Sequence, residues 1–246
     1  MTDSLTSEVW EIGPAEVLVR RRVGTDTDSG SNPAFLSALA RTYLTDQEFQ
    51  TWQAMNVGSS RKQEWLHGRL VLKDVARAWA RDIGHQIGPK DLEIRIDPAG
   101  APFIRSAALA AAGGPPVVSL THTSGLVVAA VSDPGSLLGI DVEHADRRVE
   151  VVARALNESE TRFVRAGEAS VLDLLVAKEA ATKALGVGLG GGISRWPVIA
   201  ASRQDAGLLA QVSSSTDVAL SLSVLIVHES DTVIGICYVP NDNDAA

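Results

Sequence analysis

Two carboxylates occupy alternate positions in the stretch Gly139-Ile140-Asp141-Val142-Glu143. Successive side chains of a β-strand point to opposite faces, so Asp141 and Glu143 are expected to share one face while Ile140 and Val142 occupy the other. Neighbouring carboxylates repel each other unless a cation lies between them, and such hard oxygen ligands suit Mg²⁺. The spacing predicts a metal site. An edge strand with a solvated acidic face is the alternative.

A second group of charges lies in the apolar stretch 174–186, which contains Lys178, Glu179 and Lys183. Glu179 and Lys183 are four residues apart and therefore share one face of a predicted helix. The residues around them are almost all apolar or small, which indicates burial and favours a functional pair. The alternative is an ordinary surface salt bridge between residues i and i+4.

Hydroxyl and imidazole groups gather at the end of a predicted strand, where Ser119, Thr121 and His122 precede a turn at Ser124-Gly125. Hydroxyl, imidazole and backbone N–H groups can all donate hydrogen bonds to a phosphate. The alternative is a structural or exposed histidine. The other four histidines show no spacing typical of zinc ligands.

Basic residues recur every four positions from 69 to 81, downstream of Arg61. Because residues four apart lie on one helical face, this pattern predicts a basic stripe made of Arg69, Lys73, Arg77 and Arg81. Such a stripe is usually a solvated helix face, and in an acidic protein it could also steer a partner.

Hydrophobic periodicity and turn residues predict the elements that position these groups. Helices are expected over 46–55, 61–87, 158–166 and 169–185, and strands over 16–23, 117–123, 126–132, 137–143, 218–227 and 232–239, with a loop over 24–32. Turns between the three strands from 117 to 143 suggest an antiparallel meander.

The two halves of the chain resemble each other in short segments. Leu44-Thr45-Asp46-Gln47-Glu48 resembles Leu156-Asn157-Glu158-Ser159-Glu160, and the segment 71–76 resembles 176–181. We interpret this as a tandem duplication giving an α+β fold of two similar halves, 1–132 and 133–246, with a ligand cleft between them. Chance similarity between two helix and hairpin segments is the alternative.

Composition narrows the class of protein. The chain has 246 residues, 45% of them hydrophobic, and a formal charge of −8, which argues against a general nucleic-acid binder. The polar, acidic start lacks the features of a secretory signal, and no apolar run is long enough to cross a membrane. A single cysteine, Cys237, excludes an intramolecular disulfide, so we expect a cytoplasmic protein.

Taken together, the order and spacing of these motifs resemble the 4′-phosphopantetheinyl transferase superfamily, in its larger, pseudodimeric surfactin-synthetase-activating type. The motifs are Gly-x-Asp-x-Glu at 139–143, followed about 35 residues later by Lys-Glu-Ala-x-x-Lys-Ala-Leu-Gly at 178–186, and preceded by the hydroxyl and histidine strand. The resemblance extends from about Leu44 to Trp196.

The resemblance implies Mg²⁺-dependent transfer of 4′-phosphopantetheine from coenzyme A to a serine of an acyl, polyketide or peptidyl carrier protein, with release of 3′,5′-ADP. It also implies that the first half binds the nucleotide end of coenzyme A and that the second half contains the metal-binding and catalytic residues. Asp141, Glu143 and Glu179 would bind the metal, with Glu179 and Lys183 catalytic. Coenzyme A would be bound by residues of both halves: Arg61, Arg69, Ser119, Thr121, His122, Lys178 and Lys183.

The chain departs from the family pattern in places. Thr121-His122-Thr123 replaces Ser-His-Ser, and Ala101 replaces the lysine of a Gly-Lys-Pro motif, which removes one phosphate contact. The alternative function is a catalytically silent module of the same fold that binds coenzyme A or a carrier protein. Another Mg²⁺-dependent phosphotransferase is disfavoured because the sequence lacks a Walker-type loop. Two halves in one chain favour a monomer.

Overall fold

Helices and strands alternate along the chain and form two units, each with its own sheet. The computed structural model describes residues 5–12, 15–23, 33–110, 113–189, 192–216 and 220–241. For the first two of these segments it describes the backbone only. The first unit comprises Met1–Trp10 and Val17–Gly135, and the second comprises Glu11–Glu16 and Ser136–Ala246. The main division, after Gly135, lies three residues beyond the boundary expected from the sequence.

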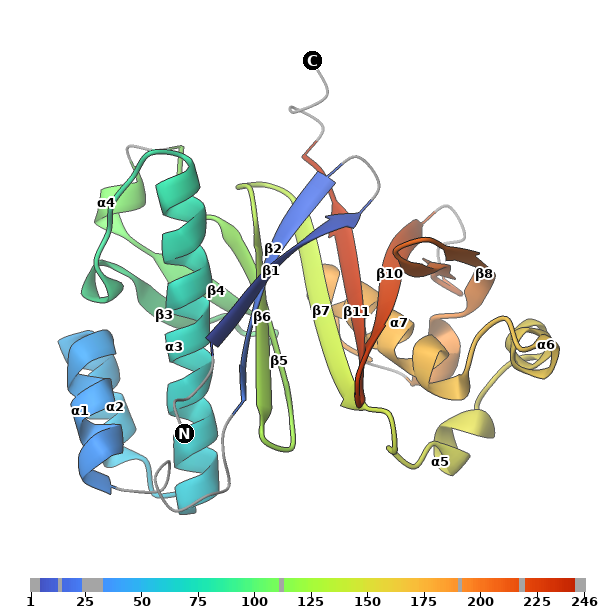
Figure 1. Ribbon diagram of the computed structural model, residues 1–246, viewed down its shortest axis with the longest axis horizontal. Coiled ribbons are helices and arrows are strands. Elements are labelled where there is room, and N and C mark those ends of the chain that lie inside the picture. The colour runs from blue at the N-terminus through green and yellow to red at the C-terminus, as the bar shows by residue number, and fades with distance from the viewer. Residues whose placement is uncertain are drawn as a thin grey trace. The chain divides into compact units, whose positions relative to one another are not determined.

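The first unit is built on a four-stranded sheet covered by one long helix. The strand order is β1 (Leu5–Ile12), β2 (Ala15–Val23), β6 (Leu126–Ser132), β5 (Val117–Thr123), and β6 runs antiparallel to both neighbours. Helix α3 (Ser59–Asp82) packs on β6 and β5 through Leu72, Val75 and Ala76 (Figure 1). The remaining elements are α1 (Pro33–Tyr43), α2 (Asp46–Ala54), η1 (Pro89–Asp91), β3 (Glu93–Ile96), β4 (Pro102–Arg105) and α4 (Ala107–Ala110).

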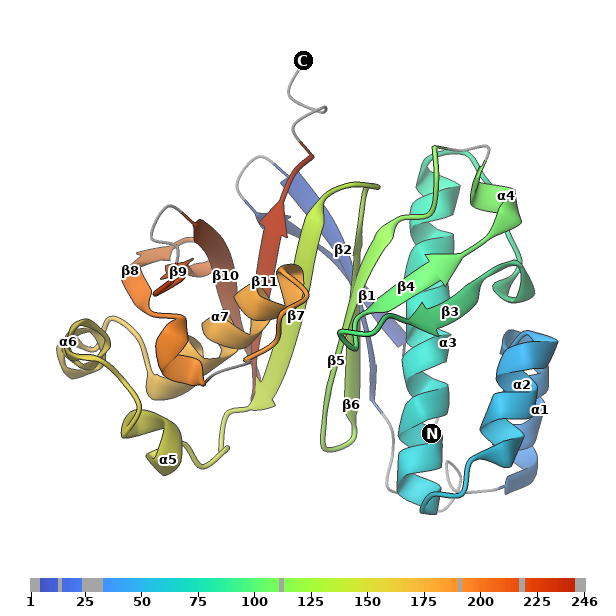
Figure 2. The same cartoon turned by 180° about the vertical axis from the view of Figure 1, so that it is seen from behind.

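The second unit has a five-stranded antiparallel sheet in the order β7 (Leu137–His144), β11 (Thr232–Val239), β10 (Ser221–Glu229), β9 (Gly207–Ser213), β8 (Val198–Gln204). Helix α7 (Val171–Ala184) lies against this sheet (Figure 2). Between β7 and α7 come α5 (Glu150–Ala153) and α6 (Glu158–Ala166), and η2 (Ile193–Arg195) precedes β8.

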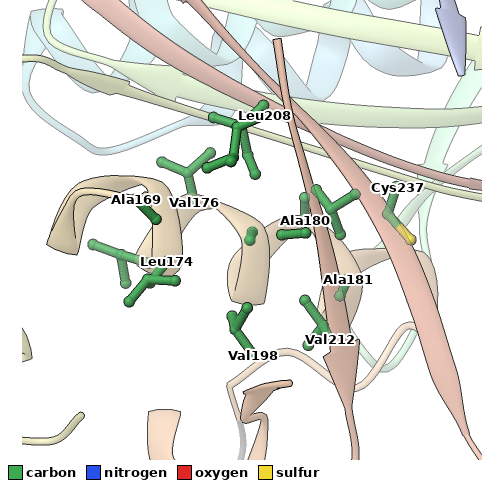
Figure 3. Packing of buried hydrophobic residues seen from close by; sticks show 14 of the residues in the cluster. Ala169, Leu174, Val176, Ala180, Ala181, Val198, Leu208, Val212 and Cys237 are labelled. Atoms are coloured by element: carbon green, nitrogen blue, oxygen red, sulfur yellow. The ribbon is translucent and has the colours of Figure 1, made fainter. Parts of the chain in front are cut away.

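The core of the second unit is rich in small residues. Ala180 and Ala181 of α7 pack among Val198, Val212 and Cys237 of the sheet (Figure 3). Small side chains let a helix backbone approach a sheet closely, so the sheet can hold the polar residues of α7 near those of β7.

Most predicted elements are present, and the differences have physical causes. Helix α3 ends at Asp82 and not at 87, because Gly84 adopts a left-handed backbone with φ of 84° that ends the helix. The prediction missed β1, β3, β4, β8 and β9, which are short or weakly patterned. The loop predicted over 24–32 lies outside the described residues.

The predicted three-stranded meander is wrong in its third strand. β5 and β6 form the expected hairpin, but β7 belongs to the other sheet and pairs with β11. In that register the buried Ile140 and Val142 lie opposite Ile236 and Ile234. The cross-strand neighbours of the apolar face of β7 thus lie almost a hundred residues later in the chain. The turn at 133–135 is where the chain passes between the two units.

No helix among the described residues is both long enough and apolar enough to span a membrane.

Candidate active site

Three carboxylates from distant parts of the chain meet in the second unit. Oxygen atoms of Asp141 and Glu143 on β7 and of Glu179 on α7 all lie within 4.8 Å of one another. Asp141 is buried, with 2% of its surface exposed, and Glu143 and Glu179 are partly buried. The alternate spacing on β7 puts Asp141 and Glu143 on the face that α7 covers, and the helix supplies the third carboxylate.

A glycine on β7 allows the backbone of α7 to lie close to the strand. A methyl group at Gly139 would lie 2.5 Å from the Ala184 nitrogen and closer still to the Ala180 carbonyl oxygen, both of them backbone atoms of α7. On the neighbouring strand, a methyl group at Gly235 would lie 2.6 Å from Val176. These glycines let the α7 backbone touch the sheet, which is why Glu179 reaches the β7 carboxylates.

Two cations balance part of this negative charge. The Lys183 ammonium group lies 2.7 Å from Asp141 Oδ1 and donates a hydrogen bond to the Ile140 carbonyl oxygen at 3.1 Å. Arg147, just beyond β7, forms an ion pair with Glu143. The Lys183 side chain is 31% exposed, so its charge lies at the edge of the cluster.

The pKa of Glu179 is raised above its usual range. Burial raises its pKa, and the nearby Asp141 carboxylate raises it further, whereas Lys183 and Arg147 act in the opposite direction. A carboxylate of raised pKa accepts a proton more readily than an exposed glutamate.

The chemistry of this donor set fits Mg²⁺. All three ligands are hard oxygen donors from carboxylates, and no cysteine or histidine belongs to the group. Three carboxylates stand beside two cations, so a formal negative charge remains that a divalent ion between them would offset. Among the described residues, this is the one group of three or more acidic, histidine or cysteine side chains arranged to hold a metal.

The first unit contains a pocket of about 410 Å³ that brings together three of the predicted nucleotide-binding residues, Arg61, Arg69 and His122. Glu64 and Trp65 of α3 also line it. The guanidinium of Arg69 lies 3.3 Å from the centre of the Trp65 ring, and its buried Nε has no hydrogen-bond partner. Burial lowers the pKa of Arg69 to about 10, and Glu48 partly opposes this shift.

Three other predicted coenzyme A contacts lie elsewhere. Ser119 and Thr121 are buried and alternate with Leu120 and His122, so they point to the opposite face of β5 from the pocket. Lys178 has no exposed surface, and its ammonium group lies 2.5 Å from Glu160 Oε1 inside the second unit. Such burial leaves Lys178 no surface to offer a ligand, so we do not assign it to the proposed coenzyme A site.

The predicted basic stripe is not a solvated face. Lys73 is fully buried and lies 2.5 Å from Glu48 Oε2, and Arg69 is directed into the pocket. Of the four residues, Arg81 is exposed and Arg77 is half-buried beside Asp74. The four-residue spacing was correct for a helix, but the stripe crosses from the surface into the core because α2 and β3 cover that side of α3.

Sequence reasoning missed Trp65 and Arg147. The signal for Trp65 was its position four residues before Arg69 on one helix face. Arg147 lies in an irregular segment after β7, where no periodicity points to Glu143.

Comparison with known proteins identifies the family. A model of the 4′-phosphopantetheinyl transferase superfamily matches residues 137–237, from the first residue of β7 into β11. The chain is 36% identical to the protein named Holo-[acyl-carrier-protein] synthase of Bacillus subtilis (strain 168) over 93 residues, which are 37% of this chain and 74% of that relative. The chain belongs to the 4′-phosphopantetheinyl transferase superfamily. It is therefore an enzyme, a phosphopantetheinyl transferase.

The matched segment contains the whole carboxylate cluster of this transferase. Asp141, Glu143, Glu179 and Lys183 all fall within residues 137–237, whereas the pocket around Arg69 precedes them. The segment that matches the superfamily and the carboxylate cluster therefore coincide in the second unit.

Proposed function

We propose that this transferase moves the 4′-phosphopantetheine arm of coenzyme A onto a serine of a carrier protein in a Mg²⁺-dependent reaction that releases 3′,5′-ADP. The observation that carries the proposal is the meeting of Asp141, Glu143 and Glu179 beside Lys183, inside the segment that matches the superfamily. The name of the Bacillus subtilis relative supports an acyl carrier protein as acceptor.

Glu179 acts as the general base in this proposal. It accepts the proton of the serine hydroxyl, directly or through a water molecule, as the serine oxygen bonds to the β-phosphorus of coenzyme A. The bond from that phosphorus to the bridging oxygen breaks, and 3′,5′-ADP leaves with the bond's electron pair. Burial raises the pKa of Glu179 in the metal-free site, and a bound divalent ion would oppose this shift, which is why the proposal includes the route through a water molecule.

A divalent ion bound by Asp141, Glu143 and Glu179 would neutralise charge on the pyrophosphate. Lys183 has its ammonium group on Asp141 and is partly exposed, so it can donate hydrogen bonds to a phosphate oxygen beside the carboxylates. Together these residues orient the pyrophosphate for attack and stabilise the charge that develops on it.

The nucleotide end of coenzyme A is assigned to the pocket in the first unit. Arg61 and Arg69 supply positive charge for phosphate, and the Trp65 ring supplies an apolar surface. The unpaired Nε of Arg69 is a donor in need of an acceptor, which supports an anionic ligand there. Because Ala101 cannot supply the lysine contact typical of the family, we expect these arginines to contribute most of the anion affinity.

We further propose that the two units arose by duplication, as in the larger, pseudodimeric type of the superfamily. The aligned 93 residues are 37% of this chain and 74% of the relative, so the relative is half as long. Two such units in one chain would act as a monomer, and we expect the protein to be cytoplasmic.

The decisive experiment measures transfer directly. The protein is incubated with coenzyme A, Mg²⁺ and a panel of apo carrier proteins, and intact mass is used to detect the addition of one phosphopantetheine. Asp141→Asn should abolish the mass gain, while Asp146→Asn, an exposed carboxylate a few residues away, should leave it unchanged.

Two outcomes would count against the proposal. An undiminished mass gain with Asp141→Asn would exclude the carboxylate cluster from the reaction. Calorimetric binding of coenzyme A without transfer to any carrier would favour the catalytically silent module.

A further inference from the structure

Each unit contains a buried glutamate and lysine joined in the same way. In the second unit, the Glu160 carboxylate lies 2.5 Å from the Lys178 ammonium group and accepts hydrogen bonds from the backbone N–H groups of Asn157 and Val198 at 2.9 and 2.8 Å. One carboxylate therefore ties the start of α6 to the middle of α7 and to the first residue of β8.

The first unit repeats this arrangement. The Glu48 carboxylate lies 2.5 Å from the Lys73 ammonium group and accepts hydrogen bonds from the backbone N–H groups of Thr45 and Ile94 at 2.9 and 3.0 Å. Here the carboxylate ties the start of α2 to the middle of α3 and to β3, the first strand after that helix. Both glutamates are also the third residues of capping boxes.

Neither pair is open to solvent or to a ligand. The side chains of Lys73 and Lys178 have no exposed surface, and Glu48 and Glu160 are 4% and 1% exposed. Each ammonium group also donates a hydrogen bond to a backbone carbonyl, Lys73 to Tyr43 at 2.8 Å and Lys178 to Ile193 at 3.4 Å, so its hydrogen bonds are made within its own unit. The pairs therefore fix the packing of helices and strands within each unit.

The position of each pair along its helix links it to function. Lys178 immediately precedes Glu179 and lies five residues before Lys183 on α7, and four of the eight α7 residues in the hydrophobic core are alanines. Alanine side chains fill little volume between one turn and the next, so they do little to fix how far the helix slides or rotates on the sheet. A directional, buried polar contact can fix both.

We infer that Glu160–Lys178 positions the metal-binding and catalytic groups of α7, and that Glu48–Lys73, one helical turn after Arg69, positions the nucleotide pocket of α3. The lysine and glutamate of each pair are positioning residues and touch no substrate. The inference rests on the proposed function for the identity of the ligands, but the two pairs can be separated by experiment because each is expected to affect a different ligand.

The test compares Glu160→Gln/Lys178→Met with Glu48→Gln/Lys73→Met, double substitutions that leave no unpaired buried charge. Binding of Mn²⁺ and of 3′,5′-ADP is measured separately by calorimetry on variants that unfold cooperatively. The first variant should weaken Mn²⁺ binding about tenfold or more, the range seen when residues supporting metal ligands are changed, with 3′,5′-ADP binding within about twofold of wild type. The second variant should show the opposite pattern.

Equal effects of both variants on both ligands would overturn the inference, and so would wild-type Mn²⁺ binding by the folded Glu160→Gln/Lys178→Met protein. If the wild-type chain binds neither ligand, the proposed function fails. In that case the inference is tested by amide hydrogen exchange of residues 179–183. The Glu160→Gln/Lys178→Met variant should exchange faster in that segment alone, and unchanged exchange would refute the inference.

Discussion

Gly139 offers a direct measure of how close approach between α7 and β7 builds the site. In Gly139→Ala, the added methyl group would lie 2.5 Å from the Ala184 nitrogen, against the 3.0 Å below which real contacts essentially never fall. The helix and strand must therefore separate by at least about half an ångström, and by more at the Ala180 carbonyl oxygen. Both obstacles are backbone atoms, so no side chain can rotate away.

The magnitude follows from this forced separation. Overpacking of this kind costs roughly 1–3 kcal/mol, and each kcal/mol lowers the Tm of a protein of this size by about 2–4 °C. Displacing Glu179 from Asp141 by up to about an ångström can reduce turnover by about 10²-fold. We therefore expect a folded, less stable protein with weaker Mn²⁺ binding and a loss of activity larger than its loss of stability explains.

The matched control for Mn²⁺ binding is Gly58→Ala, because Gly58 has no heavy atom within 4 Å of an added methyl group and a φ of −55°. Gly58 is the N-cap of α3, where alanine is less favourable than glycine, so a small loss of Tm is expected with Mn²⁺ affinity unchanged. Differential scanning calorimetry gives the change in stability, and Mn²⁺ titration reports on the site. If Gly139→Ala keeps wild-type Mn²⁺ affinity and Tm, close backbone approach does not set the geometry of the carboxylates.

Three further predictions concern single groups. Because burial and Asp141 raise the pKa of Glu179 above its unfolded value, folding favours its protonated form, and the stability linked to this group is lost as pH rises through the folded-state pKa. Glu179→Gln should thus raise the Tm of the metal-free protein at pH 7, with a gain that shrinks toward about pH 4, while abolishing transfer; a lower Tm at pH 7 would contradict the shift. Burial raises the pKa of Cys237 to about 12, so its thiol should react with a disulfide reagent at least ~100-fold more slowly in the native protein than in denaturant, and comparable rates would show that it is accessible. Arg69→Ala should weaken 3′,5′-ADP binding about tenfold, or about 1.4 kcal/mol, without lowering Tm. An equal loss of affinity with Arg81→Ala, at an exposed position, would show that the overall charge of the protein matters and not the pocket.

Local sequence patterns determined the elements that carry the second unit's site. Alternate placement of Asp141 and Glu143 in an apolar strand and the four-residue spacing of Glu179 and Lys183 each fixed which side chains share a face, because strand and helix periods are set by the backbone. Helix α6, Glu158–Ala166, and the hairpin strands β5 and β6 have the bounds expected from the sequence. Capping residues and turn glycines define such ends locally.

Only the tertiary structure decided which of the charged residues are accessible. Lys73 and Lys178 belong to patterns typical of a solvated stripe and of a ligand contact, yet both are buried against glutamates 25 and 18 residues earlier in the chain. Likewise β7 pairs with β11 and not with β6, so the strand carrying the proposed metal ligands joins the sheet that α7 covers. Periodicity assigns a side chain to a face of its own element, but burial and pairing depend on which distant segment covers that face, and this information is not local in the sequence.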